Sequence, residues 1–229
     1  MYEALINFLK LNYFVIGYGI TFLVSLYQYG KYYDTVLKFL PILFAYTFLN
    51  ELLGFFIRYY PGFSILPDLD NTSINEIIYN LYDLIFFPFF YYIYWKLIKD
   101  QTYKKYIVFG FLIVVASYLV NSFFQNPMVA PLYYANAIGC FTLIFCIVLY
   151  RCDKRKIGLK IGSKYNLVTW ISIGLLLFHS IFPFLFLMGH LKYDIWEAYH
   201  FKTVLRVLVV LMYGMFTLGL VKSKRSAFG

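Results

Sequence analysis

Residues 41–57, PILFAYTFLNELLGFFI, and residues 80–95, NLYDLIFFPFFYYIYW, decide the fold class of this chain. Each stretch is strongly apolar but carries one acidic side chain, Glu51 in the first and Asp83 in the second. A carboxylate is costly in the hydrocarbon layer of a membrane unless it is paired, protonated or in contact with water. The two stretches therefore predict a polar site inside a helical membrane protein.

The composition of the whole chain agrees with this class. Of the 229 residues, 62% are hydrophobic, and the mean hydropathy of +0.69 is too high for a soluble domain of this length. The 26 Phe and 25 Tyr are typical of ligand stacking, but Ile, Lys and Asn are also common. All these residues have AT-rich codons, so genome composition explains the aromatic residues more simply.

Seven apolar stretches of about 20 residues, the length that crosses the hydrocarbon layer, divide the chain. They lie near residues 7–29, 36–59, 74–98, 104–124, 131–150, 165–189 and 196–221. The first lacks the basic region and the cleavage pattern of a signal peptide, so we expect it to be retained as a span. The sequence predicts an all-α, polytopic membrane helix bundle with seven transmembrane helices and a single transmembrane domain over residues 1–229.

Basic residues gather at alternate boundaries of these stretches. Fifteen of the 20 Lys and Arg residues lie at the first, third, fifth and final boundaries. They are Lys31, Lys38, Lys96, Lys99, Lys104, Lys105, Arg151, Lys154, Arg155, Lys156, Lys160, Lys164, Lys222, Lys224 and Arg225. The positive-inside rule then predicts a multi-pass protein of the cell (inner) membrane with its N-terminus outside and its C-terminus in the cytoplasm.

The net charge of +9 follows from these topology determinants, which also touch anionic headgroups of membrane lipids. We expect no nucleic-acid partner. A cytoplasmic protein partner at the Arg151–Lys164 loop stays open, as does self-association into a homo-oligomer.

Polar side chains on six helices fall at one depth. Glu51 lies 13 residues from Lys38 and Asp83 lies 13 residues from Lys96, so both lie roughly 20 Å above the cytoplasmic boundary. The same measurement from the basic residue of each helix gives roughly 22–24 Å for four further residues. With the asparagines beside the acids, the predicted ligand-binding residues are Glu51, Asp83, Asn80, Asn50, His179, Arg206, Asn121 and Asn136.

Each of these residues also has a purely structural interpretation. Arg206 can extend outward to the membrane surface, and His179 can be a core histidine bonded to a carbonyl. Asn121 and Asn136 can be hydrogen-bonding links between helices. The two acids can belong to a structural network with an arginine, although intramembrane acids favour a functional site.

The spacing along two helices indicates which polar residues share a face. Glu76, Asn80 and Asp83 follow an i, i+4, i+7 pattern, which predicts one polar stripe running inward from the outer surface. Gly54 shares the face of Glu51 and allows a neighbouring helix or a ligand to approach closely.

Toward the cytoplasm, the same helices lose their polar residues. Residues 84–94, 107–116, 141–150 and 207–216 are almost free of strongly polar side chains. The bundle is therefore predicted to form a cup that is open outward and sealed inward. Pro88 and Pro183 lie inside the third and sixth stretches and predict kinks there.

The sequence gives little support for catalysis. The three histidines, His179, His190 and His200, form neither HxxxH nor HExxH spacing, and no serine nucleophile motif is present. A zinc hydrolase that uses Glu51, Asp83, His179 and His200 is a weaker alternative. We expect no metal and no cofactor, and a function that is not enzymatic.

The second stretch, KFLPILFAYTFLNELLGFFI, with its LNELLG motif and the Asn- and Tyr-rich stretch after it, resembles a group of small uncharacterised bacterial seven-helix integral membrane proteins of Bacteroidota-type genomes. In that group an acid lies in the second helix at the position of Glu51. The resemblance covers most of the chain and implies a seven-helix fold but no activity.

Three classes of function fit the predicted cup. The first is a receptor-like sensory protein, whose outer polar pocket binds a small molecule or lipid headgroup and signals to a cytoplasmic partner. The second is a lipid-acting intramembrane enzyme that uses Glu51 or Asp83 as general acid or base. The third is an oligomeric channel or membrane-perturbing effector. The one-sided cup and the sealed cytoplasmic half favour the receptor.

Overall fold

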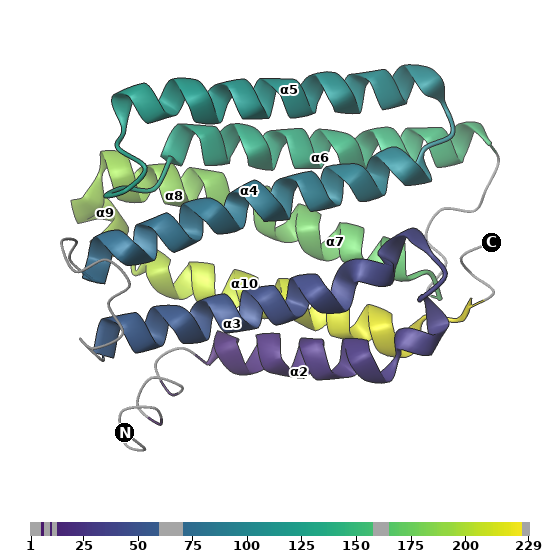
Figure 1. Cartoon of the computed structure of the whole chain (residues 1–229), viewed down its shortest axis with the longest axis horizontal. Coiled ribbons are helices and arrows are strands. Elements are labelled where there is room, and N and C mark those ends of the chain that lie inside the picture. Colours follow the sequence, from purple (N-terminus) through teal and green to yellow (C-terminus); the bar gives the residue numbers. More distant parts are fainter. Residues whose placement is uncertain (1–5, 7–9, 11–12, 60–70, 158–164, 226–229) are drawn as a thin grey trace.

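The computed structural model describes residues 6, 10, 13–59, 71–157 and 165–225, which form an all-helical bundle as the sequence predicts (Figure 1). The long helices are α3 (Leu40–Tyr59), α4 (Asn71–Leu97), α5 (Gln101–Phe124), α6 (Tyr133–Lys156) and α10 (Phe201–Lys222). The shorter ones are α2 (Phe14–Tyr27), α7 (Leu167–His179), α8 (Phe182–Leu191) and α9 (Tyr193–Ala198), with 3₁₀ turns η1 (Tyr29–Lys31) and η2 (Val36–Phe39).

Six helical stretches are long and apolar enough to cross a membrane, so by length and composition the chain is a multi-pass membrane protein. They are Val36–Ile57, Ile74–Leu97, Gln101–Phe124, Tyr133–Lys156, Leu167–Leu191 and Phe201–Lys222. The first of the seven predicted spans, residues 7–29, is represented by α2, an apolar helix of 14 residues. That helix is about 21 Å long and is too short to be counted with the six. Residues 7–9, 11 and 12 of this span lie outside the described part of the chain.

Most of the helices form a ring. Each of α2, α3, α4, α6, α7 and α10 packs against the next, and α10 closes the ring against α2 (Figure 1). α5 lies outside the ring against α6 and α4, and large apolar side chains such as Phe109, Leu119 and Phe123 are exposed on it. Such a face is suited to contact lipid.

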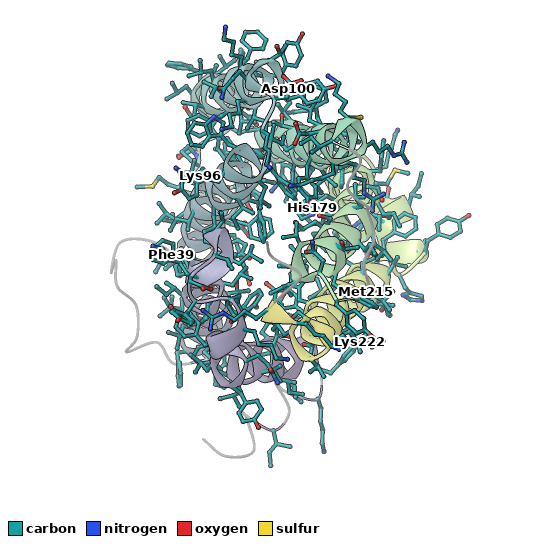
Figure 2. All side chains as sticks on the ribbon, turned by 90° about the vertical axis from the view of Figure 1, so that its right-hand side faces the viewer. Phe39, Lys96, Asp100, His179, Met215 and Lys222 are labelled. Atoms are coloured by element: carbon teal, nitrogen blue, oxygen red, sulfur yellow. The ribbon has the colours of Figure 1, made fainter. Side chains whose placement is uncertain are left out.

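One end of the bundle carries the α4–α5 turn and the C-terminal ends of α6 and α10. Figure 2 views the molecule from this end, with Lys96 and Asp100 on one side and Lys222 on the other. Two ion pairs form here, Lys156–Asp100 at 3.0 Å and Arg225–Asp34 at 2.7 Å. The hydrogen bond from Arg225 lowers the pKa of the Asp34 carboxyl.

α6 ends at Lys156, six residues beyond the end of the predicted stretch 131–150. The buried Asp153 explains the added turns. Its carboxylate accepts hydrogen bonds from the backbone N–H of Lys99 at 3.1 Å and of Asp100 at 2.9 Å, which ties α6 to the α4–α5 turn. Residues 151–156 of the proposed partner loop are therefore helical, and residues 158–164 lie outside the described part of the chain.

The sixth predicted span, 165–189, is two helices. α7 ends at His179 and α8 begins at Phe182. Pro183 is in the first turn of α8, where its missing N–H costs no helical hydrogen bond, so the predicted kink is a break. The seventh span, predicted from residue 196, is preceded by α9 and by His200 in a left-handed conformation with φ of 51°, and α10 begins only at Phe201.

The half of the bundle near the charged end is densely packed. Phe90, Tyr94, Cys146, Ile147 and Leu175 are fully or almost fully buried in one core cluster from α4, α6 and α7. Tyr94 and Ser172 share a hydrogen bond of 2.9 Å in this core. The other half of the bundle is less densely packed, and polar side chains there line a cavity.

Candidate functional site

A cavity of about 440 Å³ lies between α4, α6, α7, α8 and α10. Its described lining is Tyr18, Glu76, Tyr79, Asn80, Tyr82, Asp83, Phe86, Phe87, Pro131, Tyr133, Asn136, Phe178, His179, Phe182, Phe186, Val209, Met212 and Tyr213. The volume is within the range of small-molecule pockets. The cavity extends from the N-terminal ends of α4 and α6 to the middle of the bundle.

α4 supplies the polar stripe that the sequence predicts. Glu76, Asn80 and Asp83 line the cavity together, and Tyr79 and Phe86 extend the same face at helical spacing. The stripe thus lies on the face of α4 that looks into the ring.

Asp83 is paired across the cavity wall with α6. Asn136 donates a hydrogen bond from Nδ2 to Asp83 Oδ2 at 2.5 Å, and Asn136 Oδ1 accepts one from Cys140 Sγ at 3.5 Å. The buried Tyr118 hydroxyl from α5 lies beside Asp83. Asn136 is therefore both a link between helices and part of the cavity lining.

Glu51 lines a smaller neighbouring cavity of about 70 Å³ with Thr47 and the buried Asn50. Tyr79 donates to Glu51 Oε2 at a long 3.4 Å. Tyr18, Tyr79 and Tyr82 line both cavities, so this tyrosine wall separates Glu51 from Asp83. The two acids thus line different cavities and have different hydrogen-bond partners, Tyr79 for Glu51 and Asn136 for Asp83.

Hydroxyl groups behind the tyrosine wall connect three helices. Thr47 on α3 lies 3.1 Å from the Tyr82 hydroxyl of α4, and the Tyr213 hydroxyl of α10 donates to Thr47 Oγ1 at 3.4 Å. Tyr82 and Tyr213 do not stand out in the sequence, because tyrosine is spread over the whole chain. Only their register opposite Thr47 distinguishes them.

His179 ends α7 at the wall of the large cavity. Its Nδ1 lies 2.9 Å from the Leu175 carbonyl oxygen, which can only accept, so Nδ1 carries a proton. The ring stacks on Phe86 with centroids 5.5 Å apart. This is the core histidine of the structural alternative, and the same side chain also faces the cavity.

Two asparagines mainly stabilise the loop between α5 and α6. Asn80 Nδ2 donates to the carbonyls of Pro127 at 2.8 Å and Ala130 at 3.0 Å, and its Oδ1 accepts from the Leu132 N–H at 3.1 Å. Asn121 Oδ1 accepts from the Ala135 N–H at 3.0 Å. Asn121 is not in the lining of either cavity, whereas Asn80 is in the large one.

Arg206 lies on α10, outside the described lining of both cavities. Within the described residues, the ion pairs do not include one from Arg206 to Glu51 or Asp83. It is not brought together with Glu51 or Asp83 in the lining of these cavities.

Residues 13–59, 71–157 and 165–225 contain no group of three His, Cys, Asp or Glu side chains that could hold a metal ion. His190 instead stacks on Tyr133, with centroids 4.3 Å apart. The zinc hydrolase alternative requires His179 and His200 to meet near the acids, and the described side chains do not assemble in that way.

Gly54 accommodates a close contact between α3 and α4, as its place beside Glu51 predicts. A Cβ atom at this position would lie 3.2 Å from Asn75 Oδ1, and that oxygen is buried with no hydrogen-bond partner.

Comparisons of the chain with protein-family models, with curated proteins and with solved structures find no match.

Proposed function

We propose that this chain is a receptor-like membrane protein that binds a small molecule or lipid headgroup in the 440 Å³ cavity from the outer side and signals to a cytoplasmic partner. The observation that carries the proposal is the position of the cavity in one half of the bundle. Its lining runs from Glu76 and Tyr133 near the N-terminal ends of α4 and α6, past Asp83 and His179, to Phe87 and Tyr213.

The packed half of the bundle supports binding over transport. A path for ions or polar solutes needs polar groups along its whole length. Beyond His179 the core consists of side chains such as Phe90, Ile147 and Leu175, which are fully buried. A monomer with this core is suited to transmit helix displacements and not to conduct.

The proposed topology has seven spans, with α2 as the first, the N-terminus outside and the C-terminus in the cytoplasm. α2 packs against α3 and α10 inside the bundle, which supports its role as a membrane helix (Figure 1). The concentration of basic residues at the end with Lys96, Lys156 and Lys222 supports placing that end in the cytoplasm. The partner would then bind near the end of α6.

The binding proposal is tested with a matched pair of tryptophan substitutions on α10. Val209 lines the cavity, whereas its neighbour Val210 is 37% exposed on the bundle surface. Val209→Trp fills the cavity, and Val210→Trp adds the same side chain outside it. A small-molecule library is screened for compounds that raise the melting temperature of the parent protein in lipid nanodiscs, because a ligand that binds only the folded state stabilises it.

We expect at least some compounds to stabilise the parent and Val210→Trp but not Val209→Trp. Equal stabilisation of both variants would refute the cavity as the binding site. Steady ion flux through the parent in liposomes would favour the oligomeric channel instead, and turnover of a lipid would favour the enzyme.

A further inference from the structure

We propose that the cavity selects organic cations, specifically an ammonium group attached to an apolar or aromatic body. This inference rests on the proposed function, because it specifies the chemical class of ligand for the same cavity. It follows from the charge, the aromatic walls and the hydrogen-bonding capacity of the lining.

The described lining is acidic without a compensating base. It contains Asp83 and Glu76, and within the described residues no Lys or Arg side chain is part of it. His179 contributes its ring, but its Nδ1 proton is already used by the Leu175 carbonyl. A carboxylate in such surroundings is stabilised when a positive charge enters beside it.

Asp83 has unused hydrogen-bonding capacity. An ionised carboxylate offers about four acceptor positions. Within the described part of the chain Asp83 accepts a hydrogen bond from Asn136, and the Tyr118 hydroxyl lies beside it, so about two acceptor positions stay open. An ammonium group has several N–H donors and can bind the acceptor positions that remain.

Aromatic rings surround the space next to this carboxylate. Phe178, Phe182 and Phe186 form a stacked series along α7 and α8, with successive centroids 4.8 and 5.0 Å apart and interplanar angles of 20°. Tyr82 and Phe86 supply the opposite wall on α4, with centroids 5.4 Å apart. Aromatic faces attract cations as well as apolar groups, and this combination favours a cation with an apolar body over an anion or a sugar.

The test compares three probes that share a phenylbutyl body: phenylbutylamine, phenylbutanol and phenylbutyrate. Equilibrium binding of each radiolabelled probe is measured to the full chain in phosphatidylglycerol nanodiscs, with empty nanodiscs as the correction for partition into lipid. We expect the amine to bind roughly 10- to 100-fold more tightly than the alcohol, as a charge-assisted hydrogen bond gives, and the carboxylate to bind most weakly.

Asp83→Asn keeps the shape of the side chain and removes its charge, so it should lower the affinity for the amine at least about tenfold and lower that for the alcohol much less. The matched control is Asp34→Asn, which removes an exposed acid at the charged end and should change neither affinity. The order of the three probes on the parent protein tests the proposal even if Asp83→Asn does not fold.

The outcomes separate this inference from the proposed function. If the alcohol or the carboxylate binds as tightly as the amine, and Val209→Trp abolishes binding, the cavity is a binding site but the preference for cations is refuted. Amine selectivity that survives Asp83→Asn would also refute it. If none of the probes binds, the inference is overturned, and the library screen alone then decides the proposed function.

Adding phosphatidylethanolamine to the nanodiscs identifies the source of the ammonium group. Competition with the bound amine would assign the site to a lipid headgroup. Amine binding that is unaffected would assign it to a soluble ligand. With or without competition by phosphatidylethanolamine, the ligand of the cavity is a cation.

Discussion

Replacing Gly219 with alanine tests the packing of α10 against α7. A methyl group at this position would lie 2.5 Å from Trp170 Cβ and 3.0 Å from Leu167 Cδ1, whereas carbon atoms pack best at about 3.5–4.0 Å. Trp170 Cβ is attached directly to the backbone, so it cannot rotate away, and α7 must move. Overpacking of this kind costs about 1–3 kcal/mol of unfolding free energy.

Gly214 on the same helix provides the matched control, since a Cβ atom there would meet nothing within 4 Å. Alanine gains about 1 kcal/mol of helix propensity over glycine at either position, and this gain cancels in the comparison. We therefore expect Gly219→Ala to be about 1–3 kcal/mol less stable than Gly214→Ala. On the scale known for soluble chains of this size, the melting temperature falls by about 2–12 °C.

Thermal unfolding of both variants in nanodiscs, followed by intrinsic fluorescence, measures this difference. Equal melting temperatures would show that α7 and α10 do not approach one another as closely at Gly219 as described.

Three further predictions concern the topology, the α5–α6 loop and the charged end. In a Cys152→Ser background, Tyr199→Cys should react with an impermeant thiol reagent on intact cells and Lys156→Cys should not; the reverse labelling would invert the proposed orientation. Asn80→Ala removes three hydrogen bonds to the α5–α6 loop and should lower the unfolding free energy by about 2–3 kcal/mol in a melting experiment; a change below about 0.5 kcal/mol would contradict the role of Asn80. Because Arg225 lowers the folded-state pKa of Asp34, their pair stabilises the fold above the ordinary Asp pKa of about 3.9 and loses that effect as pH falls below it. The difference in melting temperature between the parent and Asp34→Asn should therefore shrink below about pH 4, and a difference that grows on acidification would refute the assignment.

The apolar pattern alone predicts most of the fold, because the hydrocarbon layer sets the length of each helix. Its failures have local causes. The added turns of α6 depend on Asp153, whose carboxylate binds two backbone N–H groups of a distant turn. A count of hydrophobic residues treats Asp153 as the end of a span and has no means of identifying that contact.

The site was predictable along each helix but not between helices. Helical spacing correctly places Glu76, Asn80 and Asp83 on one face, since it needs only the sequence of α4. The Asn136–Asp83 pair and the position of Arg206 away from the acids depend on how neighbouring helices are rotated. The predicted common depth of these residues in the membrane does not say how each helix is rotated about its axis.

The aromatic lining illustrates a different limit. The 26 Phe and 25 Tyr are distributed over the whole chain, so no ring is distinguished by its sequence context. Phe178, Phe182 and Phe186 become a wall only because α8 continues roughly in line with α7 after the break, which preserves their stacking.

The break between α7 and α8 divides the local stability of this part of the chain. α7 buries seven of its 13 residues and contacts α10 through Gly174 and Gly219, whereas α8 buries only Pro183 of its ten residues. Opening α8 therefore costs fewer buried contacts than opening α7. Amide hydrogens of α8 should accordingly exchange with deuterium sooner than those of α7, and a molecule held between Phe182 and Asp83 should slow the exchange of α8 selectively.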